Sequence, residues 1–375
     1  MDEKDELHDA LVIGSGPTGL ACARELAALG MLPTVVEEGP RPGAAWTARY
    51  DAMRFNTGRR TSALTDVPFP PEFEEFPTRD QYVGYLQNYA ERFGIRVRTG
   101  IRVTRIEPAD RGWAVRHGAG ALGARQVVVA TGKEGRPMVP AWPNRDDFRG
   151  ELLHSADYRN PEPYVGRDVL VVGAGCSGME IAHDLVSGGA GRVRIAVRTP
   201  PNIMPREIAG RPSDRAGPLL VRLPAPWADR LARVVRRVTI GDLSEFGLPI
   251  PTEGPFAHLL RTGKGLTAVD APVIDAIRAG RICIVPGVES LFASGAVLAD
   301  GSAAAADAII AATGYGTGLR PVAGHLGVLD EHDMPLQRDG SEAAPGLRFM
   351  GYQLRPGLPG WIGLEARRVA REMAA

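Results

Sequence analysis

Short apolar runs recur along the chain, and glycine or polar residues follow each of them. Four such runs occupy residues 11–13, 127–129, 169–172 and 308–311. Apolar runs without alternating polar residues are typical of parallel strands that are buried on both faces. Residues 18–29 follow the first run and are rich in Ala, Leu and Glu, which favours a helix. Strands that alternate with helices predict an α/β fold.

One glycine pattern closes both the first and the third run, at the point where a strand would pass into a helix. In a dinucleotide-binding fingerprint the first glycine permits a tight turn. The second lets backbone N–H groups reach a pyrophosphate, and the third lets helix and strand pack closely. The N-terminus of the helix then directs its positive dipole end at the phosphates. The predicted phosphate-binding residues are Gly14, Gly16, Pro17 and Gly19 in the first copy, and Gly173, Gly175, Ser177 and Gly178 in the second.

The two copies differ in the charge that follows their second strand. After the first fingerprint this strand ends at Glu37, whereas after the second it spans residues 193–197 and ends at Arg198. A carboxylate at this position accepts a hydrogen bond from a free ribose 2′-hydroxyl, and a cation suits a 2′-phosphate. We therefore expect FAD in the first site and NADPH in the second. Arg194 and Arg206 are the alternatives to Arg198 for the phosphate contact.

Two further strands end on the sequence Ala-Thr-Gly, where small residues let the backbone pass close to a cofactor. We expect Thr131, Thr313 and Gly314 to bind the cofactors at these strand ends. The repetition predicts two dinucleotide-binding, Rossmann-like domains, with the NADPH domain inserted into the FAD domain.

The expected boundaries follow from the positions of these strands and of the prolines. The FAD domain would comprise residues 1–160 and 301–375, and the NADPH domain residues 165–300. Proline-rich crossings at 137–163 and from 286 onward are the expected hinges. Residues 200–260 fit helix and strand patterns poorly, so we expect loops and short helices there, near the mouth of the active site.

Composition narrows the class of partner and the compartment. Lys and Arg balance Asp and Glu at 44 each, so no charge excess indicates nucleic acid or an anionic membrane surface. Cys22, Cys176 and Cys283 are far apart in the sequence, which predicts a reducing, cytoplasmic compartment, no dithiol redox centre and no metal site. No apolar run approaches the roughly 18 residues that cross a bilayer.

Between the two fingerprints lies the pattern F-x-G-x-x-x-H-x-x-x-Y, formed by Phe148, Gly150, His154 and Tyr158. It resembles the signature of flavin-containing monooxygenases at every specified position, whereas the similar Baeyer–Villiger monooxygenases carry tryptophan in place of Tyr158. Segments along nearly the whole chain follow the order of this family. The later ones, up to Gly263-Lys264 and beyond, resemble compact plant YUCCA-type enzymes and their bacterial relatives, with Lys264 expected on the surface.

The chain is thus similar to a group B flavin monooxygenase, and the resemblance implies a reaction. NADPH would reduce the flavin, which would react with O2 to a C4a-(hydro)peroxyflavin and oxygenate a small organic substrate at nitrogen or sulfur. One alternative is Baeyer–Villiger or oxidative-decarboxylating oxygenation of a carbonyl or 2-oxo acid. Another is a flavin reductase or flavin-bound regulatory module without oxygenation. The expected partners are the small-molecule substrate and O2, with a homodimer left open.

The resemblance also assigns roles to single residues. Asn56 matches the catalytic asparagine of the animal enzymes, where YUCCA-type enzymes carry histidine; an amide donates and accepts hydrogen bonds without titrating. Trp46 and Arg54 are the further expected cofactor-binding residues, and His154 takes a structural role. Ala44 replaces the usual glycine of the family, and its Cβ would crowd a backbone with positive φ.

Overall fold

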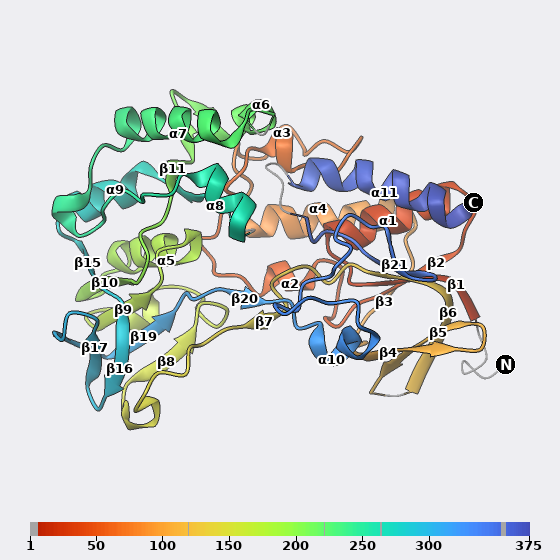
Figure 1. The fold of residues 1–375 in the computed structure, drawn as a ribbon, viewed down its shortest axis with the longest axis horizontal. Helices are drawn as coiled ribbons and strands as arrows, with labels where there is room; N and C mark the ends of the chain where they lie inside the picture. Colours follow the sequence, from red (N-terminus) through yellow and green to blue (C-terminus); the bar gives the residue numbers. More distant parts are fainter. Residues whose placement is uncertain (1–6, 119, 221, 263–264, 354–357) are drawn as a thin grey trace. The chain divides into compact units, whose positions relative to one another are not determined.

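The computed structural model describes residues 7–118, 120–220, 222–262, 265–353 and 358–375, so that Lys264 lies outside the described residues. The chain forms two compact units. The first comprises Met1–Ala48, Arg59–Pro137 and Tyr315–Ala375, and the second comprises Arg49–Gly58 and Met138–Gly314. Figure 1 shows the helices and strands of both units, coloured by their position along the chain.

These bounds differ from the expected domains in three places. Residues 49–58, 138–164 and 301–314 join the second unit. The second and third of these segments do so because their strands, β8 (Glu151–His154) and β19 (Ala308–Ala311), pair with the second sheet. Apart from residues 49–58, the chain passes from the first unit to the second after Pro137, where the proline-rich stretch begins. It returns to the first unit after Gly314 rather than near residue 286.

A largely parallel sheet forms the centre of the first unit. β1 (Leu7–Ile13) pairs in parallel with β2 (Pro33–Val36) on one side and with β6 (Gly120–Val129) on the other. The strand order is β21-β22-β6-β1-β2-β3, and β4 and β5 extend from β6 as antiparallel strands. The remaining strands of this unit are β3 (Val97–Arg98), β4 (Val103–Ala109), β5 (Gly112–His117), β7 (Arg136–Pro137), β20 (Tyr315–Gly316), β21 (Glu342–Ala344) and β22 (Leu347–Phe349).

Three long helices pack together beside this sheet. α1 (Pro17–Ala28) contacts both α4 (Arg79–Arg92) and α11 (Leu358–Ala374). Gly30, at φ +82°, follows the end of α1. The shorter helices of the unit are α2 (Ala44–Thr47), α3 (Arg59–Ser62) and α10 (Arg320–Ala323).

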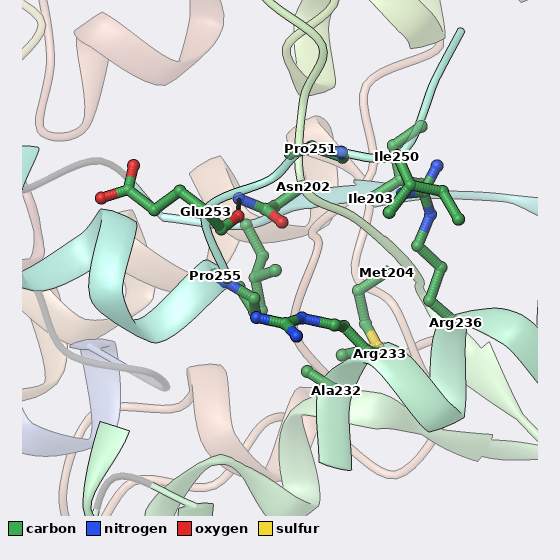
Figure 2. Close-up of a pocket in the computed structure, with 12 residues that line it drawn as sticks. Asn202, Ile203, Met204, Ala232, Arg233, Arg236, Ile250, Pro251, Glu253 and Pro255 are labelled. Carbon is green, nitrogen blue, oxygen red and sulfur yellow. Dashed lines mark hydrogen bonds between the residues drawn. The ribbon is translucent and has the colours of Figure 1, made fainter. Parts of the chain in front are cut away.

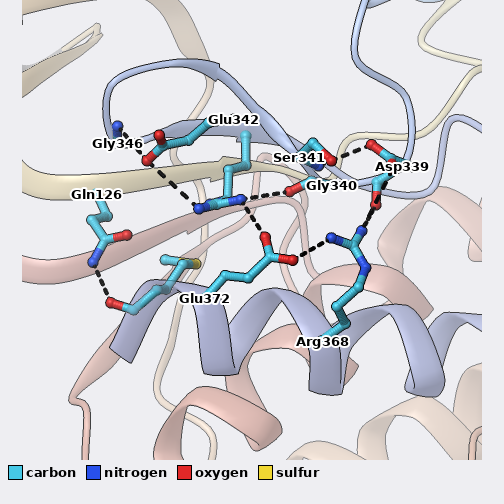
Figure 3. A network of polar contacts seen from close by, with 10 residues as sticks. Gln126, Asp339, Gly340, Ser341, Glu342, Gly346, Arg368 and Glu372 are labelled. Atoms are coloured by element: carbon cyan, nitrogen blue, oxygen red, sulfur yellow. Dashed lines mark hydrogen bonds and ion pairs between the residues drawn. The ribbon is translucent and has the colours of Figure 1, made fainter. Parts of the chain in front are cut away.

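An ion-pair network attaches α11 to the edge of the first sheet (Figure 3). Arg348 on β22 is buried, and its guanidinium donates to Glu372 on α11 at 2.9 Å and to the Gly340 carbonyl at 3.0 Å. Arg368 donates to the second oxygen of Glu372 at 2.6 Å. A terminal nitrogen of the buried cation is therefore paired with an anion and a carbonyl, as burial of charge requires.

The second unit is built on a fully parallel sheet with the order β15-β10-β9-β19-β8. Alternate residues of β9 (Asp168–Val172) face opposite sides of the sheet, as the pleat requires. Val169 and Val171 join a core with α5 (Cys176–Ser187) and α9 (Ala271–Arg278). Leu170 and Val172 join another core with the antiparallel strands β16 to β18. The other strands here are β10 (Arg192–Val197), β11 (Ile203–Pro205), β12 (Glu207–Ile208), β13 (Arg211–Pro212), β14 (Thr267–Val269), β15 (Ile282–Pro286), β16 (Val288–Phe292), β17 (Gly295–Leu298) and β18 (Ala303–Ala305).

The prediction of loops and short helices over residues 200–260 is wrong for one element, α7 (Ala225–Thr239), which has 15 residues. It packs against α8 (Pro255–Thr262), and the buried Asp229 carboxylate accepts a hydrogen bond from the Phe256 amide at 2.7 Å. The large apolar residues of α7 lie on its exposed face. A sequence pattern that assigns apolar residues to the core therefore does not reveal this helix. The exposed face carries Trp227, Leu231, Val234 and Val238, whereas the buried face carries Ala228, Asp229, Ala232 and Arg236. A four-residue helix, α6 (Gly217–Leu220), precedes it.

Candidate functional site

The first glycine fingerprint forms the turn between β1 and α1, where the sequence predicts phosphate binding. Gly14 has φ +101°, and a Cβ there would lie 2.8 Å from the Ala130 carbonyl oxygen. A Cβ on Gly19 would lie 1.9 Å from the Gly14 oxygen, so helix and turn touch directly. By contrast, a Cβ on Gly16, the N-cap residue of α1, would meet nothing within 4 Å. The open space in front of Gly16 is the place for a phosphate, and Pro17 starts the helix behind it.

Glu37 closes this turn from the end of β2. Its carboxylate accepts hydrogen bonds from the Ser15 amide at 2.9 Å, from the Ser15 hydroxyl at 2.6 Å and from the Gly39 amide at 2.9 Å. Ser15 is fully buried, so the carboxylate holds the turn residue between the first two fingerprint glycines. Carboxylate oxygens have further lone pairs for a ribose hydroxyl. The side chain therefore both shapes the cradle and fits the predicted sugar contact.

The strand end at Thr131 is fixed by the C-terminal part of the chain. The Thr131 hydroxyl forms a 2.9 Å hydrogen bond with the Tyr352 hydroxyl, which is buried. Gly351, at φ +82°, lies so close to α1 that a Cβ would come within 2.6 Å of the Thr18 hydroxyl. Sequence reasoning missed Gly351 and Tyr352. The available signal was a glycine directly after the apolar pair Phe349-Met350, similar to the glycines at the other strand ends.

The alanines that replace the family glycine cause no strain. The positive φ, +72°, falls on Gly43, which is the N-cap of α2, and Ala44 and Ala45 are helical. The crowding expected at Ala44 is therefore absent, because the left-handed residue of this turn is Gly43 and not Ala44. Trp46 on the same helix is half-buried and packs edge-on against Tyr82 at 4.8 Å between ring centroids.

The second fingerprint repeats the first in geometry. Gly173 has φ +113°, and a Cβ there would lie 2.4 Å from the Ala312 carbonyl oxygen. A Cβ on Gly178 would lie 1.9 Å from the Gly173 oxygen, and one on Gly175 would meet nothing within 4 Å. Gly175 is the N-cap residue of α5, and Ser177 lies in the first turn of that helix. The second cradle thus also leaves open space at its middle glycine and nowhere else.

Only Arg198 among the three candidate arginines has its charge available. It is exposed directly after β10 and makes no ion pair with any described residue. Arg194 is buried and donates to Asp168 at 3.4 Å and to the Ala305 carbonyl. Arg206 is buried between Glu180, at 2.6 Å, and Asp270, at 3.1 Å. Both alternatives are thus committed to structural partners.

A buried polar cluster lies beside the second cradle, on α5. Glu180 accepts hydrogen bonds from the Tyr50 hydroxyl and, at 2.6 Å, from Arg206. Burial raises the pKa of Glu180 to about 7, and Arg206 opposes that shift. Burial likewise raises the pKa of the Cys176 thiol to about 11, so it is no thiolate nucleophile. Sequence reasoning missed this cluster, since a helical glutamate carries no pattern that distinguishes it.

Tyr50 ties the segment that carries Asn56 to the second unit. The Asp51 amide donates to the Arg159 carbonyl at 2.8 Å, and the Gly58 amide donates to Asp214 at 3.1 Å. The Asn56 Oδ1 atom is buried and has no hydrogen-bond partner in the part of the chain that the structure describes. Arg54 lies two residues earlier and is half-buried. A buried amide oxygen without a donor fits a site that a bound group completes.

The pattern F-x-G-x-x-x-H-x-x-x-Y fastens β8 within the second unit. A Cβ on Gly150 would clash with the Asp307 oxygen at 2.6 Å, and Tyr158 is buried and donates to Asp184 on α5 at 2.7 Å. The nitrogens of His154 have separate partners. Nε2 lies 3.0 Å from the Gly314 carbonyl, and Nδ1 accepts from the Ala156 amide at 3.0 Å.

This pairing demands a neutral imidazole, because Nδ1 must accept while Nε2 donates. Burial lowers the pKa of His154 in the same direction. Gly314, at φ +87°, is thus held by His154, and the neighbouring Thr313 hydroxyl donates to the Met138 carbonyl. The second Ala-Thr-Gly end therefore lies in the second unit.

None of the helices in the described ranges combines the length and hydropathy that a membrane crossing requires. Cys22, Cys176 and Cys283 are free thiols. No cysteine pair therefore accompanies the two cradles.

Comparison with known proteins places this geometry in a family. Residues 11–207 match the family described as Pyridine nucleotide-disulphide oxidoreductase. Indole-3-pyruvate monooxygenase YUCCA8 of Oryza sativa subsp. indica is 36% identical over 388 residues, which cover 98% of this chain and 91% of the relative. YUCCA1 of Oryza sativa subsp. japonica, also an indole-3-pyruvate monooxygenase, is 36% identical over 311 residues, or 82% of this chain and 76% of the relative.

Solved structures share the fold across nearly the whole chain. A variant of the flavin monooxygenase from Stenotrophomonas maltophilia has a TM-score of 0.75 at 24% identity and covers 98% of both chains. Cyclohexanone monooxygenase has a TM-score of 0.77 at 19% identity, covering 98% of this chain and 87% of the other. The predicted α/β fold with two Rossmann-type domains is confirmed. The chain therefore belongs to the Pyridine nucleotide-disulphide oxidoreductase family and, within it, to the group B flavin-dependent monooxygenases, which use FAD and NADPH.

Proposed function

We propose that the cradle at Gly16 holds FAD and that the cradle at Gly175 holds NADPH. The supporting observation is the contrast between Glu37, whose carboxylate closes the first turn, and Arg198, whose exposed guanidinium has no ion-pair partner among the described residues. Bound flavin supplies the redox chemistry that activates O2 with electrons from NADPH. The chain's own residues bind the two phosphate groups and select the ribose substituent.

Asn56 is the proposed catalytic residue, and the substrate is a small molecule with a soft nitrogen or sulfur nucleophile. The buried Oδ1 atom of Asn56 has no hydrogen-bond donor among the residues that the structure describes, which makes it an acceptor for the bound cofactor or its oxygenated state. An amide holds a hydrogen bond at every pH and moves no proton. A soft nucleophile needs no protein acid or base, so this site suits amine or sulfide oxygenation.

A 2-oxo acid substrate is the second candidate. The observation in its favour is that the rice relatives, 36% identical to this chain, are named indole-3-pyruvate monooxygenases. Oxygenation of a 2-oxo acid would release CO2 and leave a shortened carboxylic acid, whereas oxygenation of a sulfide would leave a sulfoxide. The products therefore separate the two candidates.

The test measures product per NADPH with two matched panels. Aryl and alkyl methyl sulfides with tertiary amines form one, and aryl and alkyl 2-oxo acids form the other. We expect N- or S-oxide in near-stoichiometric yield from the first panel. Stoichiometric CO2 from the second, with the sulfides inert, would instead establish the 2-oxo acid. NADPH oxidation that yields only hydrogen peroxide with both panels would refute both.

We also propose a reducing compartment such as the cytoplasm. Cys283 is an exposed free thiol and Cys176 a partly exposed one. Exposed thiols survive where the compartment keeps them reduced.

A further inference from the structure

A pocket in the second unit is lined by a guanidinium to which no described carboxylate is hydrogen-bonded. Arg236 lies on the buried face of α7, its side chain is 6% exposed, and it lines a cavity of about 20 Å³. In Figure 2 the side chain extends from α7 toward Ile203 and Ile250. None of its three guanidinium nitrogens has a hydrogen-bond partner among the residues that the structure describes. A buried cation without hydrogen bonds is costly, so the arrangement favours a bound anion.

The charge of the carboxylate that lines the same cavity is already balanced by a neighbouring arginine. Glu253 accepts hydrogen bonds from His258 at 2.9 Å and from Arg261 at 2.6 Å. These contacts lower the pKa of Glu253 to about 2, so it remains a carboxylate paired with Arg261. Figure 2 shows its carboxylate on the side of the pocket away from Arg236. Glu253 therefore does not compensate the charge of Arg236.

The acidic residues on and directly after α7 also accept hydrogen bonds from groups other than Arg236. Asp229 accepts hydrogen bonds from the first amides of α8, at 2.7 and 3.3 Å. Asp242 accepts from the Ser244 amide at 2.9 Å and from its hydroxyl at 2.6 Å. Burial lowers the pKa of Arg236, and Asp242 opposes this through its charge alone, without a hydrogen bond. The strong interaction that a buried guanidinium needs must come from elsewhere.

We propose that this pocket binds a small monovalent anion, a halide or a small carboxylate, through the guanidinium of Arg236. Arg233 adds a second, exposed cation to the lining. The volume of about 20 Å³ exceeds by little the roughly 10–15 Å³ that one water needs, which fits chloride or formate better than the larger sulfate or phosphate. The walls are otherwise largely apolar, which strengthens the attraction of the ion to Arg236. They are formed by Ile203, Met204, Ile250, Pro251, Pro255 and Leu266.

None of the lining residues belongs to either fingerprint, and one of them, Leu266, contacts the second fingerprint by accepting from Cys176 Sγ at 3.9 Å. The experiment measures the thermal midpoint of the holoenzyme as chloride, formate, acetate or propionate replaces sulfate at constant ionic strength. Because sulfate stabilises folded proteins through exclusion from their surface, the readout is the midpoint of the wild type minus that of Arg236→Met in each salt. We expect this difference to rise saturably by several degrees with chloride and formate, and by progressively less with acetate and propionate. A carboxylate site would favour formate over chloride, because a guanidinium binds carboxylates through two parallel hydrogen bonds.

Arg236→Met keeps the volume and removes the charge. We expect this variant to melt at or above the wild-type temperature in sulfate, because it loses an unpaired buried cation, and to show no specific response to chloride or formate. Arg237→Met, at an exposed position of α7 that does not line the pocket, is the matched control and should respond like the wild type. Equal anion responses in wild type and Arg236→Met would overturn the proposal.

A direct measurement covers the case in which Arg236→Met does not fold. Chloride-35 resonances broaden when the ion exchanges with a protein site, so the wild-type holoenzyme should broaden the line and formate should reverse it. A chloride line that is no broader with the protein than in the same buffer without it would also overturn the proposal.

Discussion

The two phosphate cradles of this chain are nearly identical in backbone and different in what surrounds them. Both have a left-handed first glycine, an N-cap glycine that faces open space, and a third glycine in contact with the first. In the first cradle a carboxylate, Glu37, is drawn inward onto Ser15. In the second, Arg198 stays at the surface with no ion-pair partner among the described residues.

The difference shows which part of such a site is fixed by chain geometry and which by charge. The first and third glycines are dictated by close contacts that leave no room for a Cβ, so both copies must repeat them. The residue after the second strand is under no such constraint. It can therefore be an acid in one copy and a base in the other, and we propose that this alone separates FAD from NADPH.

We expect the largest effects from substitutions at the two N-cap glycines. Because a Cβ at Gly16 or Gly175 meets nothing within 4 Å, valine should be accepted by the fold and rejected by a phosphate. Gly16→Val should purify with less than about a tenth of the wild-type flavin absorbance, since a lost phosphate cradle removes several charge-assisted hydrogen bonds of about 1.5–3 kcal/mol each. Gly175→Val should purify yellow and stay yellow with NADPH under anaerobic conditions.

The control for both is Gly84→Val, on α4, where a Cβ also meets nothing within 4 Å. It should retain flavin and be reduced normally. Colourless Gly175→Val with yellow Gly16→Val would reverse the assignment of the two cofactors.

The charge difference is tested by Arg198→Ala. One charge-assisted contact is worth about 1.5–3 kcal/mol, so the preference for NADPH over NADH should fall by about ten- to a hundredfold. The measurement is the ratio of kcat/KM for the two nucleotides in flavin reduction. Arg192→Ala, at the opposite end of the same strand and also exposed, should leave the ratio unchanged. An unchanged ratio in Arg198→Ala itself would remove Arg198 from the phosphate site.

Asn56 should act after flavin reduction. Asn56→Leu is close in volume and removes an acceptor that has no partner in the described chain, so the protein without substrate should keep its stability. Flavin reduction by NADPH should be near normal, whereas hydrogen peroxide released per NADPH should rise about two- to tenfold, as expected for the loss of one hydrogen bond. Asn160→Leu, in the same unit, is the control. Equal peroxide release in wild type and Asn56→Leu would leave Asn56 as a turn residue.

The sequence was sufficient to predict the strands and turns of both cradles, because glycine spacing and buried apolar runs report local constraints. It was misleading over α7, where the apolar residues Trp227 and Val238 face solvent and Asp229 and Arg236 face inward. A hydrophobic pattern assumes that apolar faces are buried, so a helix with the opposite arrangement escapes it.

The unit boundaries were also beyond the sequence, for a different reason. Membership of β8 and β19 in the second sheet is decided by pairing with β9, a contact between segments far apart in the chain. The same holds for Asn56, whose segment joins the second unit through Tyr50 and Glu180. Side-chain partners of this kind leave no local pattern.

The smallest expected effect concerns the two Ala-Thr-Gly ends and their response to acid. Tyr352 holds the first end through Thr131, and burial raises the pKa of its hydroxyl, so it does not titrate below neutrality. His154 holds the second end in its neutral form, and burial lowers its pKa. Below the unfolded value of about 6.5 the unfolded chain gains a proton that the folded chain resists. The stability is thus fully present above that pH and is lost as the pH falls through it, by at most about 1.4 kcal/mol per pH unit for one group.

His154→Gln keeps a donor for Gly314 and removes the titration. Urea unfolding between pH 5 and 8 should therefore show a smaller loss of stability on acidification in His154→Gln than in the wild type. The remaining slope would include His183, whose pKa burial also lowers. Tyr352→Phe should lower stability equally at every pH, because it removes a hydrogen bond that does not titrate in this range. If His154→Gln keeps the full wild-type slope, His154 is not the group that makes the second strand end sensitive to acid, and this difference between the two cradles disappears.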